Sequence, residues 1–181
     1  LVQFVFDLDG TLDADALRDA LHRLLRRHPQ LSAGVRPGAS GRPVQAVVPD
    51  SAMEWHERPA PEDLEDFLAA DRRRRFDLAD PPLLRAALLR RTADRHTFVL
   101  TTHHLLVDGW SMPILVHELF SLYAGHPLPP ATPYRDFLDW LAARDARADE
   151  SAWRALLASV DGPTLVGGPG RRGATGARGR T

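Results

Sequence analysis

Residues 103–111 read His-His-Leu-Leu-Val-Asp-Gly-Trp-Ser, and this stretch lies between two segments of regular pattern. The apolar run at 97–100 before it predicts a buried strand, and residues 112–124 after it have helical spacing. Asp108 and Gly109 predict a tight turn that brings the carboxylate back toward the two histidines. A strand, a polar turn and a helix start form a rigid support for a catalytic base, so we expect an active site here.

The rest of the pattern predicts strands and helices in mixed order, which is typical of an α/β or α+β fold in which helices cover a sheet. The expected strands are Val2–Phe6, Pro43–Val48, Ala52–Glu57, Leu83–Arg91 and His96–Thr102. Helices are expected after Asp13 as N-cap, around Leu64–Leu68, from Ser111 as cap to Gly125, after Pro133, and around Trp153. Residues 32–43 predict a loop, and three tryptophans are expected in the core, namely Trp110, Trp140 and Trp153.

Composition limits the class of protein. The 181 residues suffice for one sizeable core, which we expect over residues 1–160, while the Gly- and Arg-rich segment 161–181 predicts no structure of its own. The net charge of −1 gives no electrostatic reason to expect nucleic acid or a membrane surface as partner. Cysteine is absent, which excludes thiolate chemistry, and no apolar run is long enough for a membrane span. We expect a soluble, cytoplasmic protein.

The stretch at 103–111 resembles the HHxxxDG motif of the condensation domains of nonribosomal peptide synthetases, through His103, His104, Asp108 and Gly109. Further segments resemble the family's other motifs in the same order, over roughly residues 4–157. They are Leu8–Asp13, Arg27–Leu31, Phe76–Leu78, Pro82–Ala86, Tyr134–Phe137 and Trp153–Arg154. One position departs from the pattern, because Ser32 stands where the family's second arginine is expected.

The resemblance implies a chloramphenicol acetyltransferase-like lobe, a mixed sheet covered by helices in a two-layer sandwich. It implies that His104 acts as base or amine-positioning group, with His103 pointing away and fixing the shape of the loop. Asp108 is expected to form an ion pair with Arg27, and Gly109 to let the backbone approach the thioester. Trp110 and Ser111 are expected to support the loop.

The implied reaction is amide formation, in which the amine of one carrier-bound aminoacyl group attacks the thioester of another carrier-bound acyl group. The implied partners are a donor and an acceptor peptidyl carrier protein, each presenting phosphopantetheine, with no bound cofactor and no metal. A full condensation domain has two lobes, so the resemblance covers the N-terminal lobe, and the chain alone is expected to be weakly active or inactive. A non-catalytic recruiting domain and a CoA-dependent acyltransferase of the same fold stay open as alternatives. Donor chirality and amino-acid specificity are left undecided.

A metal site at the loop is not expected, because neighbouring strand residues such as His103 and His104 face opposite sides. The other six histidines are expected at the surface or as satisfied core residues: His22, His28, His56, His96, His117 and His126. A remote alternative is a haloacid dehalogenase-like phosphatase, because Asp7 and Asp9 lie in its DxDGT pattern. The chain contains no lysine to bind the phosphate and no later acidic pair after a strand, which argues against that class.

Overall fold

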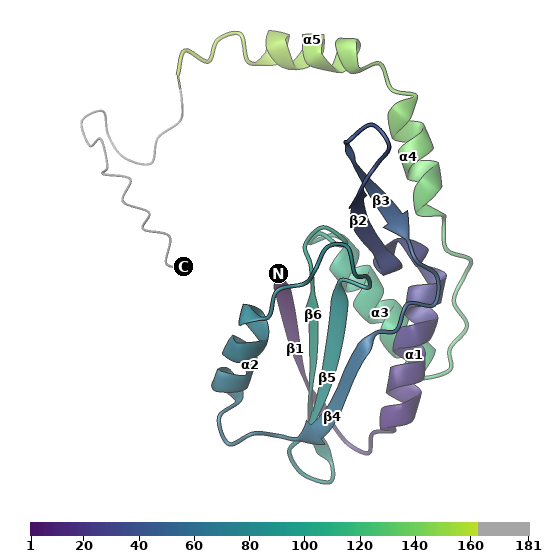
Figure 1. Cartoon of the computed structure of the whole chain (residues 1–181), viewed down its shortest axis with the longest axis vertical. Helices are drawn as coiled ribbons and strands as arrows, with labels where there is room; N and C mark the ends of the chain where they lie inside the picture. Colours follow the sequence, from purple (N-terminus) through teal and green to yellow (C-terminus); the bar gives the residue numbers. More distant parts are fainter. Residues whose placement is uncertain (163–181) are drawn as a thin grey trace, which may run out of the picture. The chain divides into compact units, whose positions relative to one another are not determined.

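The computed structural model describes residues 1–162, and the chain divides into two units, the first covering Leu1–Phe137 and the second beginning at Leu138. The first unit is built on a four-stranded mixed sheet in the order β1-β6-β5-β4 (Figure 1). Its strands are β1 (Val2–Asp9), β4 (Glu54–Pro59), β5 (Leu84–Arg90) and β6 (Arg95–Thr102). β1 and β5 both pair antiparallel with β6, and β4 pairs parallel with β5.

Both faces of the two central strands are buried, because successive side chains of a strand point to opposite faces. Leu84, Ala86 and Leu88 of β5 join the larger hydrophobic cluster, whereas Ala87 and Leu89 join the smaller one. The sequence of both strands is therefore nearly continuously apolar. Their pairing holds the end of β6 beside the start of β5.

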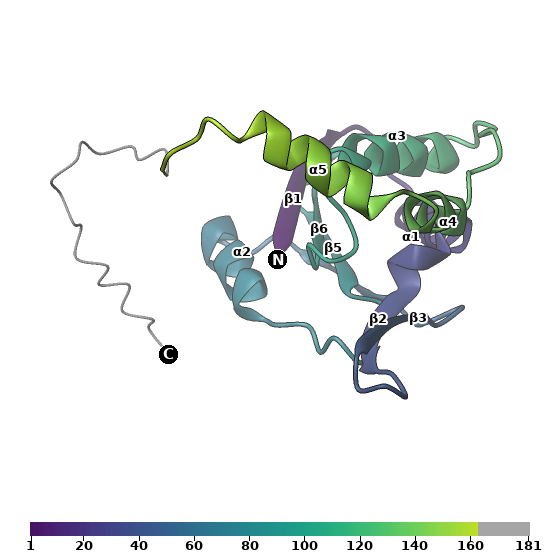
Figure 2. The same ribbon diagram turned by 90° about the horizontal axis from the view of Figure 1, so that it is seen from above.

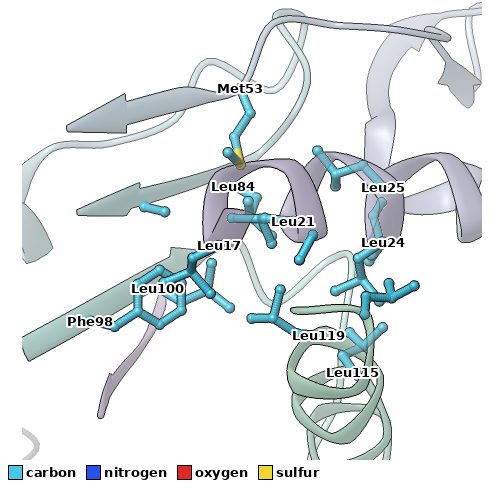
Figure 3. Packing of buried hydrophobic residues seen from close by; sticks show 14 of the residues in the cluster. Leu17, Leu21, Leu24, Leu25, Met53, Leu84, Phe98, Leu100, Leu115 and Leu119 are labelled. Atoms are coloured by element: carbon cyan, nitrogen blue, oxygen red, sulfur yellow. The ribbon is translucent and has the colours of Figure 1, made fainter. Parts of the chain in front are cut away.

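The larger cluster lies between the sheet and two helices, α1 (Ala14–Arg27) and α3 (Ser111–Tyr123), as Figure 3 shows. α1 begins at Asp13, whose Oδ1 accepts a hydrogen bond from the Ala16 N–H at 2.9 Å, as predicted. Leu17 and Leu21 of α1 are fully buried against the sheet, each contributing about 1.5–3 kcal/mol by burial. α3 ends in a Schellman motif at Gly125, whose φ is +71°.

The opposite face of the sheet carries α2 (Leu64–Arg73), and Figure 2 shows α2 on one side of the sheet and α1 and α3 on the other. Leu68 of α2 packs against Ala87, Leu89 and Val99. The predicted mixed sheet covered by helices is confirmed. The main sandwich has two layers, and α2 adds a smaller third layer.

Residues 32–43 were expected to form a loop, and this expectation is wrong. They contain β2 (Ala33–Pro37), which pairs antiparallel with β3 (Pro43–Val47) and follows a short 3-10 helix, η1 (Pro29–Ser32). The glycines of this segment serve close packing and a turn. A Cβ on Gly34 would lie 2.8 Å from the Leu78 carbonyl oxygen, and Gly41 has a φ of +76°.

Two further helices follow, α4 (Tyr134–Ala142), which spans the boundary between the units, and α5 (Ala146–Leu156) of the second unit. Both occur where predicted, but neither buries a residue within the described chain. The expectation of core tryptophans is therefore wrong: Trp110, Trp140 and Trp153 are all exposed. Aromatic residues at helical spacing predicted an apolar face, and that face is not covered here.

The prediction for the Gly- and Arg-rich segment concerns residues that lie almost entirely outside the described ones, which end at residue 162. Among the described helices, none is long and apolar enough to cross a membrane.

Candidate active site

The loop that carries the two histidines continues from the β5–β6 hairpin. Past the end of β6, the His103 N–H still donates to the Leu83 carbonyl oxygen at 2.8 Å. The chain then turns, with the Leu106 N–H donating to the His103 carbonyl oxygen at 3.0 Å. The His103 ring takes part in this turn, because its Nδ1 accepts a hydrogen bond from the Leu105 N–H at 3.1 Å. Burial lowers the pKa of His103, so its ring is neutral at neutral pH.

The far end of the loop is held by Asp108. Its Oδ1 accepts hydrogen bonds from the Ser111 N–H at 2.8 Å, the Ser111 hydroxyl at 2.7 Å and the Trp110 N–H at 3.1 Å. These donors, with the Ser111 hydroxyl first, hold the pKa of Asp108 below its ordinary value. Ser111 was predicted to cap α3 but is its first helical residue. The Asp108 carboxylate accepts from the free N–H groups at the helix start instead.

The predicted ion pair between Arg27 and Asp108 is wrong. Arg27 donates two hydrogen bonds to Glu118 of α3, from Nε at 3.0 Å and from Nη2 at 3.2 Å, and it also donates to the Pro129 carbonyl oxygen. Arg27 ends α1, and α1 packs along α3, so the guanidinium meets the middle of α3 and not its start. The Asp108 carboxylate instead accepts hydrogen bonds, through Oδ1, from the N–H groups of Trp110 and Ser111.

His28 shares the same carboxylate. Its Nε2 lies 2.5 Å from Glu118 Oε2, and the His28 and Glu118 side chains are 13% and 12% exposed. Burial alone raises the pKa of Glu118, but the hydrogen bonds from Arg27 and His28 outweigh it, so the pKa lies below its ordinary value. Glu118 is therefore an ionised carboxylate between two donors.

His104 is exposed and lies between two cavities that share the loop residues His104, Val107 and Asp108. One cavity, of about 500 Å³, extends toward η1 and the start of α4. The other, of about 480 Å³, extends toward β1 and has apolar walls that include Phe4 and Phe6. His104 therefore borders both cavities.

His28 was not predicted as a residue of this site. We expected it at the surface or in a satisfied core, but it lines the 500 Å³ cavity together with His104. Its position directly after Arg27, within a segment already assigned to the loop's support, was the signal that could have identified it.

Gly109, Trp110 and Asp108 form the exposed outer part of the loop. A Cβ on Gly109 would meet no atom within 4 Å, so neighbouring protein atoms do not require glycine there. A close approach of the substrate stays the predicted reason for this residue.

The structure also shows where the two aspartates of the phosphatase alternative lie. They lie on β1, an edge strand antiparallel to its neighbour in the described sheet, and each is near an arginine: Asp7 is 3.8 Å from Arg91, and Asp9 is 3.5 Å from Arg95. Within residues 1–162 no group of three or more His, Asp or Glu side chains has the arrangement of a metal site.

Comparison with solved structures identifies the fold class. The first condensation domain of the calcium-dependent antibiotic synthetase superposes with a TM-score of 0.69 at 22% identity, over 90% of this chain and 43% of that chain. The X-domain solved in complex with OxyB from teicoplanin biosynthesis gives a TM-score of 0.72 at 25% identity, over 92% of this chain and 40% of that one. The fold is therefore of the chloramphenicol acetyltransferase-like class.

Sequence comparison identifies the family. The model of the condensation domain matches residues 1–165. Surfactin synthase subunit 2 of Bacillus subtilis (strain 168) is 38% identical over 155 residues, which are 83% of this chain and 4% of that protein. The chain belongs to the condensation domain family, and it spans a small part of the length of the synthetase that it matches.

Proposed function

We propose that this chain contributes the catalytic histidine of a condensation domain that forms peptide bonds in nonribosomal peptide synthesis. In this reaction the amine of an acceptor aminoacyl thioester attacks the carbonyl of a donor acyl or peptidyl thioester. The new C–N bond joins the acyl group to the acceptor, the donor's C–S bond breaks, and the donor carrier's phosphopantetheine leaves as the thiol with the proton lost by the amine. The observation that carries the proposal is the position of His104, exposed on a loop between two cavities. Two substrates arriving from opposite sides need such a position.

The chemistry requires little more than one well-placed imidazole. An α-amine has a pKa of about 8, so a fair share of it is neutral at physiological pH without help. The larger task is to hold the amine near the thioester carbonyl and to accept a proton as the C–N bond forms. His104 is the proposed base or amine-positioning group, because an imidazole titrates near neutrality.

The other loop residues have supporting roles in this proposal. The side chains of His103 and Asp108 form hydrogen bonds within the loop. Their proposed role is therefore to hold the loop in its conformation. Gly109 leaves room for the thioester next to the backbone. Ser111 donates to Asp108, and the exposed indole of Trp110 flanks the turn.

The proposed partners are two peptidyl carrier proteins that present their thioesters on phosphopantetheine, which is substrate here and not a resident cofactor. The chain spans 43% of the solved condensation domain, and we propose that a further lobe, on the same or a companion polypeptide, forms the other wall of the channel. A wall that excludes water strengthens every polar contact with the reacting groups. The chain without that wall is therefore expected to be weakly active or inactive.

A recruiting role is the second candidate. The observation that favours it is the similarity to the X-domain, whose solved structure is a complex with the protein OxyB. The presence of both histidines, Asp108 and Gly109 favours the catalytic role, because a domain that only recruits does not need them. A CoA-dependent acyltransferase of the same fold is the nearest enzymatic alternative.

The test is a condensation assay with loaded donor and acceptor carrier proteins, read by intact-protein mass spectrometry. The samples are this chain alone, the complete two-lobe domain, and the complete domain with His104→Ala. Product on the acceptor carrier in the unmutated complete domain alone supports the proposal. Carrier binding without product in any sample favours the recruiting role, and transfer from free acyl-CoA favours the third candidate.

A further inference from the structure

A second imidazole lines the cavity that His104 lines, and it comes from a different element of the fold. His28 follows the end of α1, whereas His104 follows β6, and both border the 500 Å³ cavity. The two residues are 76 positions apart in the sequence, and no pattern along the chain connects them.

The hydrogen bonds of Glu118 decide which His28 nitrogen carries the proton. Glu118 already accepts two hydrogen bonds from Arg27, and its lowered pKa keeps it ionised. An ionised carboxylate only accepts, so His28 Nε2, at 2.5 Å from Glu118 Oε2, must carry a hydrogen and donate it. Nδ1 is a bare hydrogen-bond acceptor whenever this ring is neutral.

That acceptor is not used by the protein. Nδ1 of His28 forms no hydrogen bond within the described residues. It is also accessible from outside, because the buried polar atoms that lack a partner in residues 1–162 are others: Ser51 Oγ, Trp55 Nε1 and His96 Nδ1. A fixed, mostly buried ring that borders a cavity and has an accessible acceptor is suited to bind a donor group of a ligand.

We propose that His28 is an amine-binding residue of this site, whose Nδ1 accepts a hydrogen bond from the α-amino group of the acceptor substrate. The inference rests on the proposed function and adds a second contact to the amine's binding site. Arg27 and Glu118 are the positioning residues, because they fix the ring's orientation and the tautomer without touching the substrate.

Two substitutions separate this role from a structural one. His28→Gln keeps an N–H donor at the position of Nε2 for Glu118 but removes the acceptor at Nδ1. His28→Asn places an amide oxygen near the position of Nδ1 but does not reach Glu118. If His28 only supported the fold, His28→Gln would behave like wild type.

The experiment uses the 181-residue chain labelled with ¹⁵N-histidine and two stable probes. One probe is glycyl-pantetheine amide, in which N–H replaces the thioester sulfur, and the other is acetyl-pantetheine amide, in which a hydrogen replaces the amino group. We expect the glycyl probe to shift the His28 Nδ1 resonance. We also expect His28→Gln to weaken binding of the glycyl probe about tenfold and to leave binding of the acetyl probe unchanged. His28→Asn should weaken it less.

Equal losses for both probes, or no loss in His28→Gln, would overturn the inference. An unshifted His28 resonance in the wild-type chain at saturation with the glycyl probe would do the same, and that measurement needs no variant to fold. The proposed function fails separately, namely if the complete wild-type domain forms no product in the condensation assay.

Discussion

The two walls of the cavity differ in how they hold their imidazole. His104 is exposed on a loop kept in shape by neighbours close in sequence, such as the hydrogen bonds of Asp108 to residues two and three positions further on. His28 is mostly buried and held by Glu118, a residue 90 positions away on another helix. The first wall is a local motif, whereas the second exists only when α1 and α3 have packed. Substitutions in the second wall should therefore lower the stability of the fold more than substitutions in the first.

The largest effect on stability is expected for Glu118→Ala. It leaves Arg27 and His28, which are mostly buried, without their shared acceptor. Loss of one partner from a mostly buried ion pair costs about 3 kcal/mol of unfolding free energy. Urea denaturation followed by circular dichroism measures it.

The matched control is Asp19→Ala on α1, because Asp19 lies 4.0 Å from Arg23 in an exposed pair. Its effect should stay within about 0.5 kcal/mol. If both variants lose the same amount, the Glu118 cluster does not hold α1 to α3.

A smaller effect is expected for Asp108→Ala, which removes the acceptor at the start of α3. Loss of a helix cap should lower the Tm by about 2–4 °C, and Asp108→Asn, which keeps an acceptor oxygen, should recover most of the loss. Thermal unfolding of the three proteins at pH 7 decides this. A much larger fall would mean that the loop, and not the Glu118 cluster, is the stronger support.

The pH dependence of stability sharpens the comparison further. The pKa of Glu118 is lowered from 4.5, so the unfolded chain binds its proton more readily than the folded one. The stabilisation is present above pH 4.5 and is lost as the pH falls through the lower, folded value. Urea midpoints between pH 3 and 6 should fall less steeply in Glu118→Gln than in wild type. Identical slopes would show that Glu118 carries no such linkage.

The smallest effect on stability is expected for Gly109→Ala. The added Cβ meets no protein atom within 4 Å, so the Tm should change by less than about 2 °C. Activity of the complete domain should nevertheless fall if the thioester approaches this part of the backbone. Unchanged turnover would remove Gly109 from the proposed site.

The same difference explains what the sequence could predict. The strands of the β5–β6 hairpin, the cap at Asp13 and the turn at Gly125 follow from apolar pattern and short-range turn chemistry, and they were predicted correctly. The partner of Arg27 depends on how α1 packs on α3, which no local pattern encodes, and it was predicted wrongly. β2 was missed because the packing of Gly34 against Leu78 outweighs the low strand propensity of glycine.

The exposed tryptophans show a related limit. Trp140 and Trp153 have the spacing of a buried face, yet helical spacing predicts only that a face is apolar and says nothing of what covers it. The candidate site was predicted in part. The loop that carries His104 could be predicted from the sequence, but the wall of the cavity that carries His28 could not.

The most direct measurement is the single-turnover rate of dipeptide formation by the complete domain carrying His104→Ala, beside the matched control His117→Ala, an exposed histidine on α3. We expect His104→Ala to slow transfer about 100-fold or more with an unchanged unfolding curve, and His117→Ala to react like wild type. Equal rates in the two variants would contradict the role of His104 as base or amine-positioning group.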